Sequence, residues 1–183
     1  MISTLPTRLD GPILIEPRVV ADDRGFFLET YRREPYRDAG VLGDLVQDNH
    51  SRSTRGTIRA LHFQTEPGQP KLVRVARGRV FDAVVDLRRS SPTFGEWESF
   101  ELDDVRHLQL YVPIGFAHGF CVVSDVADFV YKVGSYYDPG TERGIAWDDL
   151  DLGIPWPAPD PVVSERDRHN PTLAAAAADL PAW

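Results

Sequence analysis

The sequence has one cysteine, two lysines and no long apolar run, and each shortage excludes a class of protein. Cys121 alone cannot form an intrachain disulfide, which fits a reducing compartment. The opening residues, MISTLPTRLDGPILIEPR, lack the basic start and apolar stretch of a secretory signal, so we expect a cytoplasmic location. Apolar runs of about 18 residues, the length of a membrane-spanning helix, are also missing, so we expect no membrane partner.

Positive charge is scarce as well. The chain carries 28 acidic and 20 basic side chains, a formal net charge of −8. Proteins that bind nucleic acid normally present a basic face, so we expect no nucleic-acid partner, although a local basic pocket for a phosphorylated small molecule is compatible with this balance. Lys71 and Lys132 are the only lysines among the 20 basic residues. Either these two lysines stand at positions that need a compact ammonium group, or they are present by chance.

Long amphipathic helices are missing, whereas turn residues are frequent. A length of 183 residues fits a single domain, and the 14 Gly and 15 Pro make about 16% of it, where about 12% is usual. Alternating apolar and polar residues predict strands at 58–64, 71–76, 79–87, 107–112, 120–123 and 128–133. Short helices are expected only at 34–41 and 174–178. Short strands without intervening helices predict an all-β, antiparallel sandwich or barrel.

The densest polar cluster of the sequence lies between Gln47 and Lys71, and it contains His62. A regular strand here would place Arg59 and Leu61 on one face, and Ile58, Ala60, His62 and Gln64 on the other. Apolar neighbours favour partial burial of His62. A partly buried histidine beside arginine and lysine is a candidate base or anion ligand, and a structural role is the alternative.

A second cluster, Pro113–Phe120, is a glycine-containing turn that carries His118. Together with the segment around His62 it resembles the two motifs of the cupin superfamily. Metal-binding cupins carry His-x-His and a glutamate in the first motif, but here Gln64 stands in place of the second histidine. Two imidazoles without a nearby carboxylate make a poor site for a transition metal, so we expect acid–base chemistry without a metal.

A longer ordered set of motifs gives a closer resemblance, over about residues 10–173. The set is DRGFFLET from 23, QDNHS from 47, RALHFQ from 59, KLVRV from 71, GFAHGF from 115, YK from 131, GIPWP from 153 and SERD from 164. It resembles the dTDP-4-dehydrorhamnose 3,5-epimerase family. The resemblance implies a cupin-type antiparallel jelly-roll barrel with short peripheral helices, no cofactor and a homodimer. It also implies one cupin domain over 1–183, with an N-terminal arm at about 1–30 and a C-terminal helical tail at about 165–183.

The resemblance also implies an activity and a set of residue roles. The family inverts C3 and C5 of dTDP-4-dehydro-6-deoxy-D-glucose to give dTDP-4-dehydro-L-rhamnose. By motif, His62 is the base, Asp167 orients it, Tyr131 is the acid on the opposite face and Lys71 lies near the C4 oxygen. The implied substrate-binding residues are Arg24, Phe27, Glu29, Gln47, Asn49, Arg59, His118, Tyr137, Glu142 and Arg166, with Tyr137 stacking on thymine.

Four departures from the family pattern keep other activities open. Ala60 replaces a usual glycine, Ile114 a frequent arginine, Gly134 a frequent threonine and Arg166 a lysine. None of them replaces one of the four implied catalytic residues. The alternatives are an epimerase acting at C3 or C5 alone on a related dTDP-4-keto-deoxysugar, a metal-dependent cupin, and a non-catalytic sugar-nucleotide-binding cupin.

Overall fold

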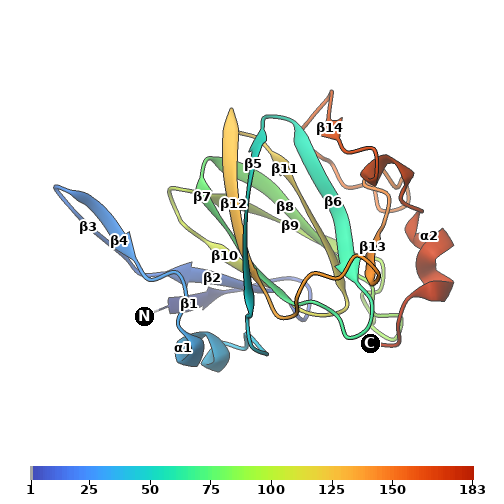
Figure 1. Cartoon of the computed structure of the whole chain (residues 1–183), viewed down its shortest axis with the longest axis horizontal. Helices are drawn as coiled ribbons and strands as arrows, with labels where there is room; N and C mark the ends of the chain where they lie inside the picture. Colours follow the sequence, from blue (N-terminus) through green and yellow to red (C-terminus); the bar gives the residue numbers. More distant parts are fainter. Residues whose placement is uncertain (1) are drawn as a thin grey trace.

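The computed structural model describes residues 2–183, and two antiparallel sheets facing one another make up its body (Figure 1). The first sheet has the order β1 (Ile2–Leu5), β2 (Ile13–Pro17), β10 (Gln109–Val112), β7 (Lys71–Arg77), β12 (Val126–Val133) and β5 (Gln47–Thr54). The second has the order β13 (Glu142–Gly144), β6 (Thr57–Gln64), β11 (Phe116–Val122), β8 (Arg79–Asp86) and β9 (Trp97–Asp103). The short strand β14 (Val162–Val163) runs parallel to β6.

Strand β8 shows how the sequence alternation becomes two buried faces. Val80 and Val84 point into the core between the sheets, where they join a cluster with Phe129 of β12. Ala83 and Val85 belong to a second cluster, on the outer side of the second sheet. Both faces are therefore apolar, as expected for a central strand covered on each side. This alternation places Asp82 on the inner face, with Val80 and Val84.

Strand β6 departs from the regular alternation that the sequence suggests. His62 pairs with His118 of β11 and Arg59 pairs with Phe120, so two residues of β6 lie opposite the single Gly119. This extra residue is a β-bulge, and it shifts the phase of the side chains by one. As a result Arg59 and His62 line one cavity, while Ala60 and Leu61 pack in the outer cluster. The prediction that Arg59 and His62 face opposite sides is wrong.

Two segments extend from the barrel on opposite sides (Figure 1). The hairpin of β3 (Val19–Asp22) and β4 (Gly25–Leu28) forms a sheet of its own and projects away from the other strands. At the other side, the C-terminal segment contains the 3₁₀ turns η1 (Asp167–His169) and η2 (Ala177–Asp179) and the helix α2 (Leu173–Ala176). Helix α1 (Arg33–Asp38) lies within the range predicted to be helical, apart from its first residue. No helix among residues 2–183 is long and apolar enough to cross a membrane.

The C-terminal segment packs on the outer face of the second sheet. Leu173, Leu180 and Trp183 join the outer cluster with Ile58 and Leu61 of β6. The helix α2 begins at Thr172, whose hydroxyl accepts a hydrogen bond from the Ala175 amide, the usual cap of a helix N-terminus. This packing brings the last 20 residues of the chain alongside β6 and β13, the strands that carry His62 and Glu142.

Candidate active site

A cavity of about 360 Å³ opens between the two sheets and collects most of the polar residues singled out in the sequence. Its walls come from β5, β6, β7, β11, β12 and the segment before and into β13. The lining residues are Gln47, Asn49, Ser51, Arg59, His62, Gln69, Lys71, His118, Phe120, Phe129, Tyr131, Tyr137 and Glu142. Nine of the predicted site residues therefore share one cavity, although they are spread over almost 100 positions of sequence.

His62 forms a hydrogen-bonded pair with Asp167. Its Nε2 lies 2.7 Å from Asp167 Oδ1, and the carboxylate is almost fully buried. Burial alone would raise the pKa of Asp167, but hydrogen bonds from His62, Ser164 and the Ala60 backbone outweigh it and lower the pKa. An ionised carboxylate on one ring nitrogen fixes the orientation and tautomer of the imidazole, so His62 is built to accept a proton at its other nitrogen.

A second histidine–aspartate pair lies beside the first. His118, which is opposite His62 in the ladder between β6 and β11, has its Nε2 2.9 and 3.0 Å from the two carboxylate oxygens of Asp82. Asp82 is completely buried, and burial raises its pKa despite the opposing effect of His118 and Lys71. The sequence did not single out Asp82. Its one signal was a carboxylate on a strand whose neighbours on both faces are apolar.

Lys71 brings a cation to the same cavity from the first position of β7. Burial lowers its pKa to about 8, although Glu142 and Asp82 both act in the opposite direction. A lysine in this range is protonated near neutral pH and loses its charge with a small rise in pH. The cavity thus contains a cation that is weakly hydrated and close to two carboxylates.

Tyr131 completes the reactive groups of the cavity. It projects from β12 and packs against Phe129, with ring centroids 6.0 Å apart. Burial, with a contribution from Glu142, raises the pKa of the phenol. Tyr131 therefore keeps its proton at neutral pH and can act as a donor.

One rim of the cavity is a chain of polar contacts that links predicted binding residues. The backbone amide of Tyr137 donates to Gln47 Oε1 at 3.1 Å, and Gln47 Nε2 donates to Asn49 Oδ1 at 2.9 Å. The Tyr137 hydroxyl donates to Glu142 at 2.8 Å, and Arg166 forms an ion pair with the same carboxylate. This chain ties β5, β13 and the C-terminal segment together at the cavity entrance.

Three predicted binding residues lie outside the cavity of their own chain. Arg24 and Phe27 are on the β3–β4 hairpin, where Arg24 pairs with Asp22 and Phe27 is 72% exposed. Glu29 follows the hairpin and accepts a hydrogen bond from Arg32 at 3.0 Å. Within one chain, the structure does not bring these three residues to the other eleven predicted site residues.

Each of the two histidines that line the cavity has a carboxylate beside it. The sequence suggested two imidazoles without a nearby carboxylate, but Asp167 and Asp82 each lie within 3.0 Å of a histidine nitrogen. Each carboxylate binds one imidazole rather than converging with the other on a common point. Within residues 2–183, no group of three or more His, Cys, Asp or Glu side chains could hold a metal ion.

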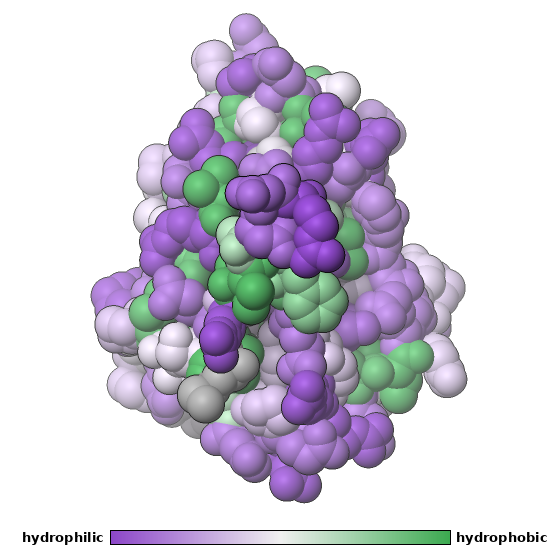
Figure 2. All heavy atoms as spheres, turned by 90° about the vertical axis from the view of Figure 1, so that its left-hand side faces the viewer, coloured by the Kyte–Doolittle hydropathy of each residue, from purple (hydrophilic) through white to green (hydrophobic). Residues whose placement is uncertain are grey.

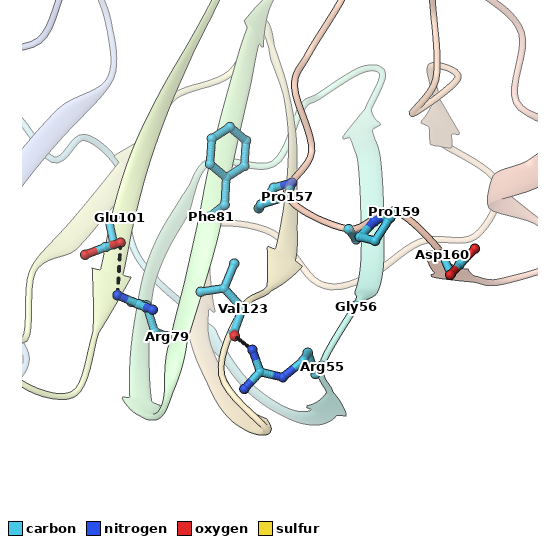
Figure 3. Close-up of a pocket in the computed structure, with 10 residues that line it drawn as sticks. Arg55, Gly56, Arg79, Phe81, Glu101, Val123, Pro157, Pro159 and Asp160 are labelled. Carbon is cyan, nitrogen blue, oxygen red and sulfur yellow. Dashed lines mark hydrogen bonds and ion pairs between the residues drawn. The ribbon is translucent and has the colours of Figure 1, made fainter.

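A different cavity, of about 550 Å³, lies at the far ends of β8 and β9 (Figure 3). Arg79 faces Glu101 at 3.5 Å, and Arg55 donates to the Val123 carbonyl and to Asp125 at 2.8 Å. Phe81 and Pro157 form an apolar wall beside them (Figure 3). Both guanidinium groups already have acceptors, and there is no histidine or tyrosine in the lining, so this cavity offers no acid–base pair.

Comparison with known proteins agrees with the geometry of the first cavity. The model of the family described as dTDP-4-dehydrorhamnose 3,5-epimerase matches residues 6–175. The chain belongs to this family. A dTDP-4-dehydrorhamnose 3,5-epimerase of Pseudomonas aeruginosa is 50% identical over 174 residues, which cover 93% of this chain and 96% of the relative. A dTDP-4-dehydrorhamnose 3-epimerase of Streptomyces niveus is 44% identical over 173 residues, 93% of this chain and 84% of the relative.

Solved structures of the family have the same fold. The dTDP-6-deoxy-D-glucose-3,5-epimerase of Legionella pneumophila, solved in complex with dTDP-4-keto-L-rhamnose, superposes with a TM-score of 0.96 at 41% identity and covers 100% of this chain and 99% of its own. The expected family and the cupin-type antiparallel jelly roll are therefore confirmed. The protein is an epimerase of this family, and hence an isomerase, as the sequence predicted.

Proposed function

We propose that this epimerase inverts C3 and C5 of dTDP-4-dehydro-6-deoxy-D-glucose and gives dTDP-4-dehydro-L-rhamnose, without a cofactor. The observation that carries the proposal is the meeting of His62–Asp167, Lys71 and Tyr131 at one cavity. A base, a cation and a phenol are what a 4-keto sugar needs for inversion at the carbons beside the ketone. Binding alone would need no such acid–base set.

The proposed reaction moves one proton at a time. His62 removes the proton from the carbon beside C4, and the electron pair moves to the C4 oxygen as an enolate. Lys71 stabilises that charge as a point cation aimed at the oxygen. Tyr131 donates a proton to the opposite face of the same carbon, which completes inversion. His62 then releases its proton to solvent and the Tyr131 phenolate takes one up from solvent, so that both groups are reset and the cycle repeats at the second carbon.

Seven further residues are proposed to hold the nucleotide sugar. Planar guanidinium groups match phosphate oxygens, so Arg59 and Arg166 are suited to the diphosphate. The exposed ring of Tyr137 at the cavity entrance is suited to stack on thymine. The other members of the set are Gln47, Asn49, His118 and Glu142.

We further propose a homodimer in which the β3–β4 hairpin reaches the cavity entrance of a partner subunit. Support comes from the hairpin itself, which exposes Val20, Phe26 and Phe27 by 52%, 57% and 72%. Figure 2 shows apolar side chains among polar ones on the face from which it projects. A two-stranded hairpin with exposed aromatic side chains is typical of a protein–protein contact. This arrangement would bring Arg24 and Phe27 to a substrate, with Glu29 at the base of the hairpin.

Inversion at a single carbon is the second candidate, favoured by the 44% identity to the Streptomyces niveus 3-epimerase. Incubation with dTDP-4-dehydro-6-deoxy-D-glucose in D₂O decides between the two. Deuterium at both C3 and C5 of an L-configured product supports the main proposal, and deuterium at C3 alone supports the 3-epimerase.

A His62→Ala variant should bind dTDP as the wild type does and incorporate no deuterium. Substantial deuterium exchange in that variant would exclude His62 as the base.

The cytoplasmic location expected from the sequence stays a proposal. It is supported by Cys121, the single cysteine, which is a buried free thiol. Fractionation of the source cells, with detection of the protein in the cytosolic fraction, tests it.

A further inference from the structure

The carboxylate of Asp167 reaches His62 from a segment that is far away in the sequence. The two residues are 105 positions apart, and η1, which carries Asp167, is a single turn of three residues. Within the segment, Ser164 accepts a hydrogen bond from the Asp167 amide at 3.1 Å. That bond shapes the turn, but it does not fix the turn against the barrel. Against the barrel, the start of the turn is held by the Ala60 backbone hydrogen bond to Asp167 and by the ion pair of Arg166 with Glu142, and its other end makes a further contact.

Asn170, the residue that ends η1, makes such a contact. Its carboxamide occupies the space in which a side chain of Gly144 would lie: a Cβ at residue 144 would be 2.3 Å from Asn170 Nδ2 and 2.6 Å from Cγ. Gly144 is the direct partner of His62 in the ladder between β13 and β6. The end of η1 therefore rests on the backbone position opposite His62.

We propose that Asn170, seated on Gly144, is a positioning residue that holds Asp167 at hydrogen-bond distance from His62. This inference rests on the proposed role of Asp167 in orienting the base. The carboxamide nitrogen of Asn170 is buried and has no hydrogen-bond partner among residues 2–183. The position of the carboxamide is therefore set by its packing against the backbone of Gly144. The carboxamide fits there because residue 144 has no side chain.

The chain beyond Asn170 continues to follow the barrel. The Ala146 amide donates to the Pro171 carbonyl at 2.7 Å, and the Leu173 amide donates to Asp149 Oδ2 at 2.7 Å. These two bonds fix the segment on the side away from Asp167. A group added at residue 144 would therefore displace Asn170 and the adjacent end of η1 relative to the anchored residues on either side, and the hydrogen bond of the dyad would lengthen.

Three variants test the contact: Gly144→Ala, Asn170→Ala and the double variant. The methyl group of the first displaces the carboxamide, so we expect kcat to fall about 10- to 100-fold, the size of effect seen when a reacting group moves by about 1 Å, with KM within about twofold. Asn170→Ala should lower kcat by a smaller factor than Gly144→Ala does. The double variant should recover most of kcat, because the new methyl group fills the space that the carboxamide leaves.

The proton shared by His62 and Asp167 gives a readout that does not need turnover. Its low-field ¹H resonance should be present in the wild type, lost in Gly144→Ala and restored in the double variant. Gly140→Ala is the matched control, since a Cβ there meets nothing closer than Asp138 Oδ1 at 3.1 Å, and it should keep both the resonance and kcat. If the pattern of resonances holds while the wild type does not epimerise the sugar, the proposed function fails and the positioning role stands.

Two results would overturn the inference. One is a Gly144→Ala variant that folds normally and keeps the wild-type kcat and resonance. The other is a double variant whose kcat is as low as that of Gly144→Ala. Such a result would mean that the methyl group distorts strand β13 itself and does not act through the contact with Asn170. Thermal unfolding of each variant separates both results from a simple loss of stability.

Discussion

The surroundings of four ionisable side chains at or beside the cavity shift their pKa values in different directions. Asp167 is stabilised as an anion by the hydrogen bonds that it accepts, whereas burial makes the charged form of Asp82 costly. Lys71 and Tyr131 are shifted in opposite directions by the same cause, burial, which lowers the pKa of the lysine and raises that of the phenol. Such contrasts between neighbouring groups are what acid–base catalysis at one carbon requires.

Tyr131→Phe should separate removal of the proton from inversion. His62 can still form the enolate and return a proton to the face it left, so solvent deuterium should still enter the substrate. Inversion should fall by about 10²- to 10⁴-fold, the usual effect of a lost general acid. The measurement compares the rates of deuterium incorporation and of product formation. Unchanged rates of both would identify Tyr131 as a packing residue and the acid as another group.

The pH dependence of kcat should report Lys71. Because its pKa is about 8, the cation that stabilises the enolate is lost as the pH rises through this value, and kcat should fall on the alkaline side. Lys71→Arg keeps the charge at high pH, so its profile should lose this decline, at a lower plateau because a guanidinium is larger.

Lys132→Arg is the control for that profile, since Lys132 is the only other lysine and pairs with Asp48 at 2.7 Å. It should show the wild-type decline. A decline near pH 8 that persists in Lys71→Arg would assign the titration to a different group.

At the scale of strands, the alternation of residues predicted six strands of the two sheets, but it missed the irregularities and the strands β1, β2, β5, β9 and β13. The structure has strands at all six predicted ranges. The bulge in β6 was not predictable, because a period of two contains no information about an extra residue. Asp82 was missed for a related reason: its importance comes from His118 on a neighbouring strand. Asp167 could be singled out only by resemblance, since nothing local distinguishes it from a loop carboxylate.

If the proposed homodimer forms through the hairpin, substitutions there should weaken both the dimer and the activity. Burying a phenylalanine side chain contributes about 1.5–3 kcal/mol, and Phe27→Ser removes one from each subunit, so it should raise the dissociation constant of the proposed dimer about 10²- to 10⁴-fold. Analytical ultracentrifugation measures this constant, and kcat/KM should fall at protein concentrations where the dimer dissociates. Val105→Ser is the control, because Val105 is 79% exposed and lies outside the hairpin.

A mixture of two inactive variants tests whether the hairpin acts across the interface. His62→Ala supplies intact hairpins, and Arg24→Ala supplies intact cavities. If the hairpin serves the partner subunit, mixed dimers contain one complete site and activity returns on mixing. Absence of any recovery, with mixed dimers demonstrated, would contradict the proposed arrangement.

For the whole molecule, acid should destabilise the fold through Asp86. Burial opposes its ionisation, but hydrogen bonds from Arg88, Ser91 and Thr93 outweigh burial and lower its pKa to about 2. The unfolded chain, with a value near 3.8, binds more protons between these pH values, so stability rises with pH there and is lost as pH falls from about 4 to about 2. The expected loss is about 2 kcal/mol. Urea unfolding from pH 2 to 6 measures it.

Asp86→Asn should remove that part of the pH dependence and be less stable than the wild type at neutral pH. Asp160→Asn serves as the control, because Asp160 is exposed at the end of a loop. Equal pH slopes for the wild type and Asp86→Asn would show that other carboxylates account for the acid lability.

The separation of 105 positions between His62 and Asp167 has a consequence for biosynthesis. A ribosome releases the strands of the barrel well before it releases η1, so a nascent chain can close its sheets while the orienting carboxylate is still in the exit tunnel. Contacts between residues so far apart also form slowly in refolding. Enzymatic activity should therefore return later than the fluorescence change of the partly buried Trp97 on β9. The appearance of enzymatic activity would then mark the docking of η1, the last step in the folding of this protein.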